Sequence, residues 1–403
     1  MEPPVIAVET HSPTLSVEIL KARAAVLLPQ IAAGAAERDR ERRLPQAEVR
    51  RIGASQLLTW RVPASHGGPD ASVGEVIGFV IDLAAADSNV AQALRPGFAF
   101  LEGLRLGQTE TDPALWYHRF LSGDVFGNAG WEVGGANGAI SSRIVADGEA
   151  FKVNGSKYYS TGSLFADWVS AVALDEADKP VSFILPRDRE GLVLVDDFDA
   201  MGQRLTASGT TRLENVTVHP HEIRRRSGGA GADKRSPVTP FLQLFLGAVM
   251  AGIARAARND AAAFARDFAR PIKHSPAAKS VDDPYVQFSV GEIAAKAYAA
   301  EAVVLKAAEA IEAAYAAPDD PVLVNQAAIE VAQAQYIAAE SALKAAELVF
   351  DVGGASTTSR AHNLDRHWRN ARTVTNHNPR HWKAAAAGAW HLTGQEPPNS
   401  GLF

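Results

Sequence analysis

The sequence contains no cysteine among its 403 residues. Disulfide bonds, thiolate nucleophiles and metal sites with thiolate ligands are therefore excluded, and redox arguments do not decide the compartment. An excess of basic charge is also missing, since 40 Lys and Arg stand against 46 Asp and Glu, a net charge of −6. Such a chain carries no electrostatic footprint for nucleic acid or for an anionic membrane. The expected partners are small molecules.

A secretory signal pattern and a membrane-spanning run are missing as well. The N-terminus, MEPPVIAVETHSPTLSVEIL, has prolines and acidic residues where a secretory signal needs a basic start and an apolar run. The most apolar window, residues 241–254 (FLQLFLGAVMAGIA), is short for a span and is bounded by Pro240 and Arg255, which favours a buried core helix. We therefore expect a cytoplasmic protein that is not inserted in a membrane.

The hydrophobic pattern changes twice along the chain and predicts three domains. Residues 1–121 keep apolar side chains three and four apart, which indicates a helical domain. Residues 122–235 alternate in short runs separated by Gly, Asp and Pro, which is typical of strands. Residues 236–403 return to the helical period and are rich in alanine, as expected of long helices packed in a bundle. The ligand site is expected where the three domains meet.

Helix limits follow from the same periodicity. Well-defined helical patterns cover residues 73–86, 88–104, 239–268, 283–317 and 321–349. We expect a break at Pro96, because proline lacks the backbone N–H that a helix interior uses.

Residues 350–379, FDVGGASTTSRAHNLDRHWRNARTVTNHNP, combine a glycine pair with a run dense in Arg, His and Asn. Gly353 and Gly354 can adopt backbone angles closed to other residues and let a flat ligand approach the main chain. This concentration of hydrogen-bond donors suggests a binding site. A helix C-cap followed by a surface loop explains the stretch equally well.

Four phrases in this order resemble the acyl-CoA dehydrogenase superfamily over nearly the whole chain. They are VNGSKYYSTGS at 153–163, AMGQRLTASGTTRLENVTV at 200–218, ARPIKHSPAAKSVDDPYVQFSVGEI at 269–293, and the run from Gly353 to Arg372. The resemblance implies an α+β fold with an N-terminal helical domain, a middle β-barrel domain and a C-terminal four-helix bundle. It also implies a flavin between the β domain and the bundle.

Three further phrases are similar to the flavin-dependent monooxygenase branch of that superfamily, the branch that includes dibenzothiophene monooxygenase. They are FGNAGWE at 126–132, RPIKHS at 270–275 before DDPYVQ, and LDRHWRNARTVTNHNP at 364–379. The resemblance implies a two-component enzyme that takes reduced FMN, rather than FAD, from a separate NAD(P)H:flavin reductase by diffusion. With O₂ and a C4a-(hydro)peroxyflavin it would oxygenate a small apolar heteroatom-containing or aromatic substrate. A homotetramer is implied too.

Missing carboxylates separate this interpretation from a dehydrogenase. An acyl-CoA dehydrogenase needs a carboxylate base, which its relatives place either in the loop that here reads Thr375-Asn376-His377-Asn378 or on the first bundle helix. That loop and residues 234–258 contain no Asp or Glu. Two alternatives stay open: an FAD-dependent acyl-CoA dehydrogenase that uses another carboxylate, and a non-catalytic helical binding or scaffold protein.

Oxygen chemistry on a flavin needs neutral hydrogen-bond donors in a dry pocket. Asn128 and His377 match the oxygen-handling positions of the branch and are the predicted catalytic residues. For Asn128 alone, an amide satisfied by backbone groups is the competing interpretation. His362, His367, His377 and His381 do not repeat a known metal-ligand spacing, so no metal is expected.

The resemblance also implies cofactor and substrate contacts. The predicted flavin contacts are Tyr159, Ser160, Thr161, Ser163, Gly353, Gly354 and Arg372, with Arg270, His274 and Ser275 as an anion site that reaches a flavin in a neighbouring subunit. Taken by themselves, the last three are better explained by a polar connection between two helices. Arg369, three residues before Arg372, is expected to pair with Asp365 or Asp351. The predicted substrate wall is Phe98, Trp131, Phe241 and Phe245, which would otherwise be ordinary core residues.

Overall fold

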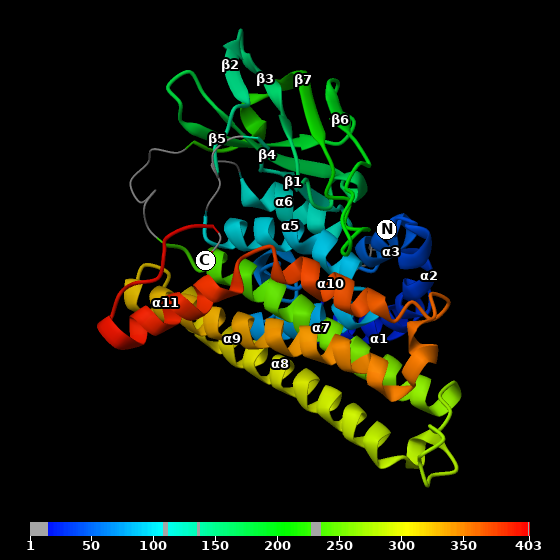
Figure 1. Cartoon of the computed structure of the whole chain (residues 1–403). Coiled ribbons are helices and arrows are strands. Elements are labelled where there is room, and N and C mark those ends of the chain that lie inside the picture. Colours follow the sequence, from blue (N-terminus) through cyan, green and yellow to red (C-terminus); the bar gives the residue numbers. More distant parts are fainter. Residues whose placement is uncertain (1–14, 108–111, 135–137, 227–234, 402) are drawn as a thin grey trace, which may run out of the picture.

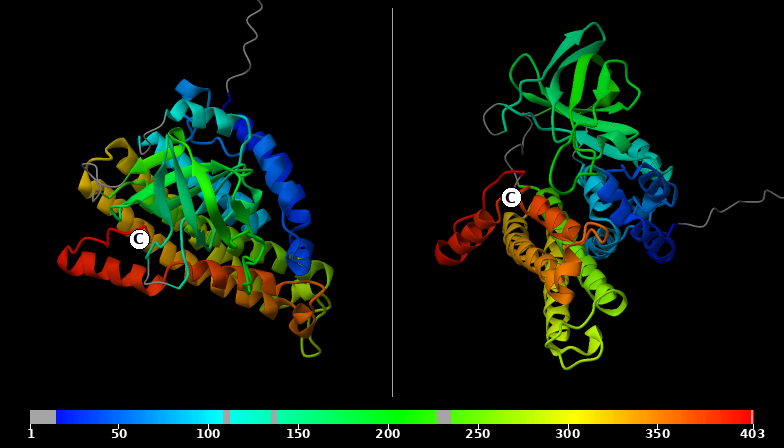
Figure 2. Two further views of the ribbon diagram at one scale, coloured as in Figure 1. Left: turned by 90° about the horizontal axis from the view of Figure 1, so that it is seen from above. Right: turned by 45° about the vertical axis from the view of Figure 1, so that its right-hand side comes forward.

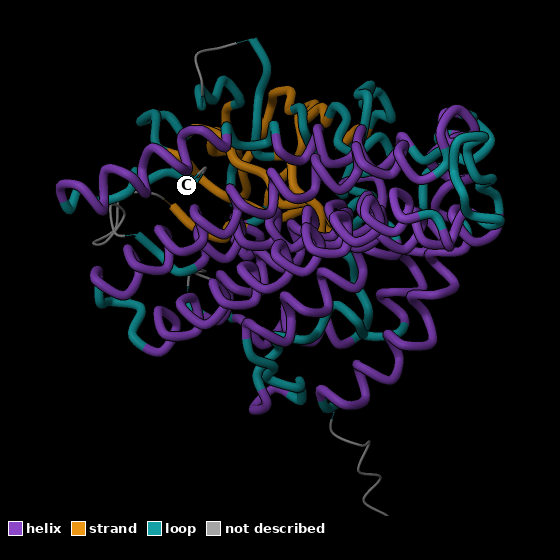
Figure 3. Tube along the Cα trace, turned by 60° about the horizontal axis from the view of Figure 1, so that its bottom comes forward, coloured by secondary structure: helices purple, strands orange, loops and turns teal. Residues whose placement is uncertain are grey.

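The computed structural model describes residues 15–107, 112–134, 138–226, 235–401 and 403 (Figure 1). Helices at both ends of the chain form one thick layer, and the strands of the middle segment lie over one side of it (Figures 2 and 3). The N-terminal helices are α1 (Val17–Ala33), α2 (Ala35–Glu41), α3 (Gln46–Ala54), α4 (Val73–Ala86), α5 (Ser88–Arg105) and α6 (Pro113–Leu121).

Capping side chains determine where α4 and α5 begin. Ser72 and Glu75 form a reciprocal capping box at the start of α4, and the Asp87 side chain accepts the backbone N–H of Asn89 at the start of α5. Helix α5 continues through Pro96, so the predicted break is wrong. Packing of α5 against α7 and β1 holds the helix together, although Pro96 cannot donate to the Gln92 carbonyl one turn earlier.

The middle segment folds into one eight-stranded sheet. Its strands are β1 (Phe126–Ala129), β2 (Arg143–Asp147), β3 (Ala150–Lys157), β4 (Trp168–Leu174), β5 (Pro180–Pro186), β6 (Leu192–Leu194), β7 (Thr211–Val218) and β8 (Ile223–Arg226). The order is β6-β7-β3-β2-β4-β5-β8, with β1 parallel to β4. The strands at the two ends of this path, β6 and β8, do not pair with each other in the described part of the chain. The sheet is therefore open, and the expected barrel is wrong.

The C-terminal segment is built on α7 (Val238–Asp267), α8 (Pro284–Ala316) and α9 (Pro321–Leu348), followed by α10 (Asp365–Thr375) and α11 (Arg380–Thr393). The predicted limits of the three long helices agree with these to within one residue. Helices α7, α8 and α9 pack on one another, α10 packs on both α7 and α9, and α11 packs on α9.

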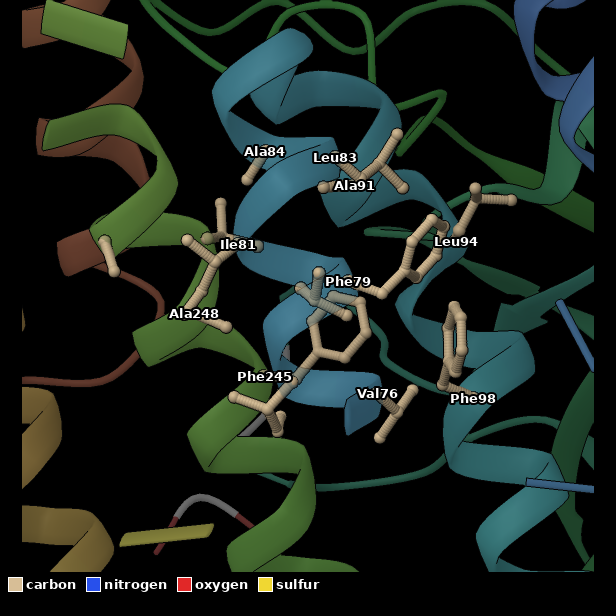
Figure 4. Packing of buried hydrophobic residues seen from close by; sticks show 14 of the residues in the cluster. Val76, Phe79, Ile81, Leu83, Ala84, Ala91, Leu94, Phe98, Phe245 and Ala248 are labelled. Atoms are coloured by element: carbon tan, nitrogen blue, oxygen red, sulfur yellow. The ribbon is translucent and has the colours of Figure 1, made fainter. Parts of the chain in front are cut away.

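Helix α7 is the centre of the helical layer. It is long and apolar enough to cross a membrane, but 83% of its most apolar window is buried inside the protein, as predicted for a core helix. The rings of Phe79, Phe98 and Phe245 meet between α4, α5 and α7 (Figure 4). At Gly252 a Cβ atom would lie 2.5 Å from the Ala84 Cβ, so glycine is what allows α4 to approach α7 this closely.

Candidate active site

A pocket of about 490 Å³ lies where α5, the sheet and the end of α10 meet, which is the predicted location. This volume is in the usual range for small-molecule sites. Its walls come from segments far apart in the sequence: Gln92, Arg95, Asn128, Trp131, Tyr158, Tyr159, Thr161, Phe198, Asp199, Ala200, Gln203, Thr206, Ser208, Thr373, Val374, Asn376 and His377.

Unpaired polar atoms set this pocket apart from the other hollows. The Oε1 atoms of Gln92 and Gln203, the Nε of Arg95 and the Oδ1 of Asn128 are buried and have no hydrogen-bond partner in the described part of the chain. Hollows of about 590 Å³ beside α1 and about 600 Å³ beside α11 are larger but contain one such atom each. Since buried polar groups are normally paired, the pocket is built for a polar ligand.

Asn128 lies on β1, opposite Ser170 of β4. Its backbone N–H donates to the carbonyl of Thr161 at 3.2 Å, which holds the strand against the pocket wall. Backbone groups do not satisfy its side-chain oxygen, contrary to the competing interpretation of this residue. The side chain is therefore available to a ligand.

An ion pair anchors the chain just after β1. Glu132 accepts a hydrogen bond from the Lys157 ammonium, and its carboxylate also accepts from the backbone N–H of Ser141 at 2.7 Å and the hydroxyl of Ser142 at 2.7 Å. Although burial acts in the opposite direction, these hydrogen bonds lower the pKa of Glu132 to about 2. Trp131, the residue before Glu132, pairs with Tyr158 by a backbone bridge and lines the pocket.

Hydroxyl groups line the side of the pocket formed by the segment after β3 and the segment before β7. The hydroxyl oxygens of Thr161 and Ser208 are 3.0 Å apart, and those of Ser208 and Thr206 are 2.8 Å apart. Ser160 is fully buried beside them, and its hydroxyl has no partner among the described residues. Ser163 is buried but does not line the pocket.

Three non-glycine residues around the pocket have left-handed backbones: Tyr159 at φ 57°, Gln203 at φ 53° and Ala207 at φ 52°. This region is uncommon for side-chain-bearing residues, and such strain gathers at functional sites.

His377 follows α10 and faces the pocket together with Arg95 of α5. The guanidinium Nη2 of Arg95 donates to the Nε2 of His377 at 3.0 Å. Loss of solvation and the adjacent positive charge of Arg95 lower the pKa of His377 to about 3. The imidazole is therefore neutral at physiological pH, and its proton is on Nδ1 because Nε2 accepts from Arg95.

One carboxylate lines the described pocket wall, that of Asp199, and it is exposed. The half-buried Asp260 of α7 lies elsewhere, where it is paired with Arg366 and with His367 at 2.8 Å. The loop after α10 and the described part of 234–258 supply no carboxylate to this pocket.

Comparison with known proteins finds relatives over most of the chain. Residues 244–382 match the family described as acyl-CoA dehydrogenase, C-terminal domain. Dibenzothiophene monooxygenase of Rhodococcus qingshengii is 29% identical over 380 residues, 91% of each chain. The probable FMNH2-dependent monooxygenase SfnC of Pseudomonas putida is 28% identical over 383 residues, 93% of this chain and 95% of its own. FMN-bound TdsC of Paenibacillus sp. A11-2 superposes with a TM-score of 0.89 at 27% identity, covering 96% of this chain and 100% of TdsC.

Over nearly its whole length the chain is similar to the acyl-CoA dehydrogenase superfamily, and these relatives support the predicted dibenzothiophene monooxygenase-like branch. The predicted α+β fold of this superfamily is thereby confirmed. FMN is the cofactor of this branch, and the residues present fit it. The isoalloxazine edge alternates carbonyl and N–H groups: the unpaired amide oxygens of Gln92, Asn128 and Gln203 can accept from its N–H groups, and the unpaired hydroxyl of Ser160 can donate to a carbonyl.

The site residues that were predicted from the sequence fall into two groups. Asn128, Trp131, Tyr159, Thr161 and His377 line the pocket, and Ser160 lies beside it. The other predicted cofactor residues do not line it in the single chain. Arg270, His274 and Ser275 belong to the connection between α7 and α8, at the end of the helical layer opposite the sheet (Figures 1 and 2).

The glycine pair and the two arginines have roles within the fold. A Cβ at Gly353 would lie 2.3 Å from the Phe264 ring, so close packing on α7 already requires this glycine. Arg369 pairs with Asp365 at 2.7 Å, as predicted, and with Asp39 at 2.7 Å. Arg372 is half-buried near Thr375 and does not line the pocket.

Of the four predicted substrate-wall residues, the structure brings one, Trp131, to the pocket. Phe98, Phe241 and Phe245 are buried in the main hydrophobic core, which is the alternative that the sequence left open. The aromatic wall consists instead of Trp131, Tyr158, Tyr159 and Phe198. Sequence reasoning also missed Gln92, Arg95 and Gln203. The signal for Arg95 was a charged residue within QALRPGFAF, an otherwise buried helical run.

Proposed function

We propose that this protein is a two-component flavin monooxygenase that uses reduced FMN and O₂ to oxygenate a small heteroatom-containing or aromatic substrate. The overall reaction transfers one oxygen atom to the substrate, releases the other as water and leaves oxidised FMN. One observation carries the proposal: the pocket gathers unpaired neutral polar groups, while the positions that hold the base of a dehydrogenase contain no carboxylate. A separate NAD(P)H:flavin reductase supplies the reduced cofactor.

Bound reduced FMN supplies the activation of O₂ in this reaction. Asn128 and Ser160 offer unpaired side-chain atoms that hold a flat polar ring in place. His377 stays neutral and holds its proton at Nδ1, because Arg95 donates to Nε2. Trp131, Tyr158 and Tyr159 form an aromatic wall on one side of the pocket.

The proposal extends to assembly as a homotetramer in the cytoplasm. Tyr285 and Phe288 of α8 are 83% and 68% exposed, and large exposed aromatic side chains are typical of interfaces. Arg270, His274 and Ser275 lie shortly before these residues in the chain, so the same contact would carry them to a flavin of the neighbouring subunit. The division into domains 1–121, 122–235 and 236–403 stays a prediction.

Rapid mixing of the reduced-FMN complex with O₂ tests the function. We expect a transient flavin absorbance that differs from those of oxidised and reduced FMN, and labelled oxygen from ¹⁸O₂ in the product. An FAD-dependent dehydrogenase would instead bind FAD tightly and would be reduced by an acyl-CoA without oxygen. Absence of any flavin binding would favour a scaffold protein. Either result would contradict the proposal.

A further inference from the structure

Arg95 is half-buried and, unlike the buried Arg38 and Arg61, has no carboxylate partner among the described residues. Arg38 pairs with Asp87 at 2.9 Å, and Arg61 pairs with Glu102 at 2.9 Å. Among the described residues no ion pair includes Arg95, and its Nε is buried without a hydrogen-bond partner. A guanidinium in such a position normally requires a counter-charge, because a desolvated charge without one is costly.

The immediate surroundings do not provide that counter-charge. Its one side-chain contact in the pocket is the neutral imidazole of His377, at 3.0 Å. The exposed carboxylate of Asp199 forms no ion pair with it. Burial alone lowers the pKa of Arg95 to about 10, so the group is still charged at physiological pH. Burial also lowers the pKa of Arg224 and of Arg235, but both have hydrogen-bond acceptors. Arg224 donates to the hydroxyl of Ser170 at 2.7 Å and lies over the Phe100 ring, and Arg235 donates to the side-chain oxygen of Asn325 at 2.9 Å.

The position of Arg95 indicates where the missing anion belongs. Arg95 touches His377, which occupies the loop at the reacting end of the predicted flavin site. The phosphate of FMN is carried by a ribityl chain, away from the ring edge at which oxygen reacts. A group bound by Arg95 would therefore lie beside the reacting centre, where the substrate must be.

We infer that the substrate of this enzyme carries an oxyanion, a carboxylate or a sulfur oxyanion, which the guanidinium of Arg95 binds directly. The inference rests on the proposed function and narrows its substrate class from small heteroatom-containing or aromatic molecules in general to those that carry an anionic group. A planar guanidinium matches such a group with two parallel N–H donors. The aromatic wall of Trp131, Tyr158 and Tyr159 then receives the apolar remainder of the molecule.

Calorimetric titration of the flavin-free, full-length protein tests this assignment. The probes are benzoate and benzenesulfinate, and benzamide is the neutral match for benzoate. We expect the two oxyanions to bind at least tenfold more tightly than benzamide. Arg95→Gln should abolish that preference, and Arg95→Lys should retain part of it. Arg143→Gln removes the same charge from an exposed pair with Asp178 and should behave as the wild type.

Several outcomes would overturn the inference. One is equal binding of benzoate and benzamide by the wild type, and another is no binding of either oxyanion. A third is a preference that survives in Arg95→Gln. If Arg95→Gln weakens FMN binding tenfold but leaves benzoate binding unchanged, the counter-ion is the flavin and the inference is wrong. Should Arg95→Gln fail to fold, the wild-type preference and the Arg95→Lys titration decide.

The proposed function can fail independently of this inference. The titration requires neither flavin nor oxygen, so a protein that shows the Arg95-dependent preference but no oxygen transfer would refute only the monooxygenase activity. Conversely, oxygen transfer to a neutral substrate with no contribution from Arg95 would refute only the inference that the substrate carries an oxyanion.

Discussion

Replacing Glu132 by Gln should destabilise the protein strongly, because it leaves the Lys157 ammonium buried without its counter-charge. The Lys157 side chain is 0% exposed and that of Glu132 is 7% exposed. Breaking such a pair by removing one partner costs about 3–5 kcal/mol. The lowered pKa of Glu132, about 2 against a usual 4.5, leads to a similar upper bound of about 3 kcal/mol.

Urea unfolding at several pH values measures this effect. The depressed pKa of Glu132 means that its stabilisation is complete above about pH 4.5 and is lost as the pH falls toward 2. The difference between wild type and Glu132→Gln should therefore be largest at pH 7 and should shrink at pH 3. Since Gln retains the shape of Glu, loss of packing would not produce this pH dependence.

Two matched variants separate the buried charge from other causes. Adding Lys157→Met to Glu132→Gln removes the orphaned ammonium and should restore most of the lost stability. Glu309→Gln breaks a pair with Lys306 in which both side chains are more than two-thirds exposed, and should cost less than about 1 kcal/mol. A Glu132→Gln protein within about 1 kcal/mol of wild type at pH 7 would refute the reasoning.

Three other expectations follow from the site and the core. Asn128→Ala and His377→Ala should each lower product formed per reduced FMN by about 10²-fold, as loss of a positioned donor does; full coupling in both would show that neither handles oxygen. Because the pKa of His377 is lowered to about 3 from its usual 6.5, folding stability should fall as the pH drops from 6.5 toward 3, and an unfolding series with His377→Asn should show a shallower fall. Gly252→Ala should lower the free energy of unfolding in urea by about 1–3 kcal/mol, because it overpacks the α4–α7 contact. Gly388→Ala, which has no described atom within 4 Å of its Cβ position, should raise it by about 0.5–1 kcal/mol. Equal effects at both sites would contradict the packing argument.

The sequence predicted the long helices well because their limits are local. Pro284 and Pro321 begin α8 and α9 after the capping residues Asp283 and Asp320, and the alanine-rich period continues without interruption to the far end. The continuation of α5 through Pro96 could not be read in this way, because packing against α7 and β1 decides it.

Sheet closure and the substrate wall could not be predicted from the sequence either, because both depend on contacts between distant segments. Whether β6 meets β8 depends on pairings between distant segments, and an alternating pattern does not encode them. Phe98, Phe241 and Phe245 have the same apolar character whether they face a core or a cavity, so only the packing of α4, α5 and α7 distinguishes the two.

Asn128 and His377 could be predicted because phrases resembling a known branch surround them. The charge of Arg95 was visible in the sequence, but its significance was not. That significance depends on what is missing around the guanidinium in space, namely a carboxylate, and a sequence does not display which groups lie near one another.

The left-handed backbones of Tyr159, Gln203 and Ala207 have a consequence for ligand capture. A free peptide seldom visits these angles, so the cavity they shape exists only while the surrounding elements are fully assembled. The pocket is therefore preorganised by folding, and ligand binding does not have to supply the free energy of arranging it. Partly opened molecules should lose their affinity before they lose their helices.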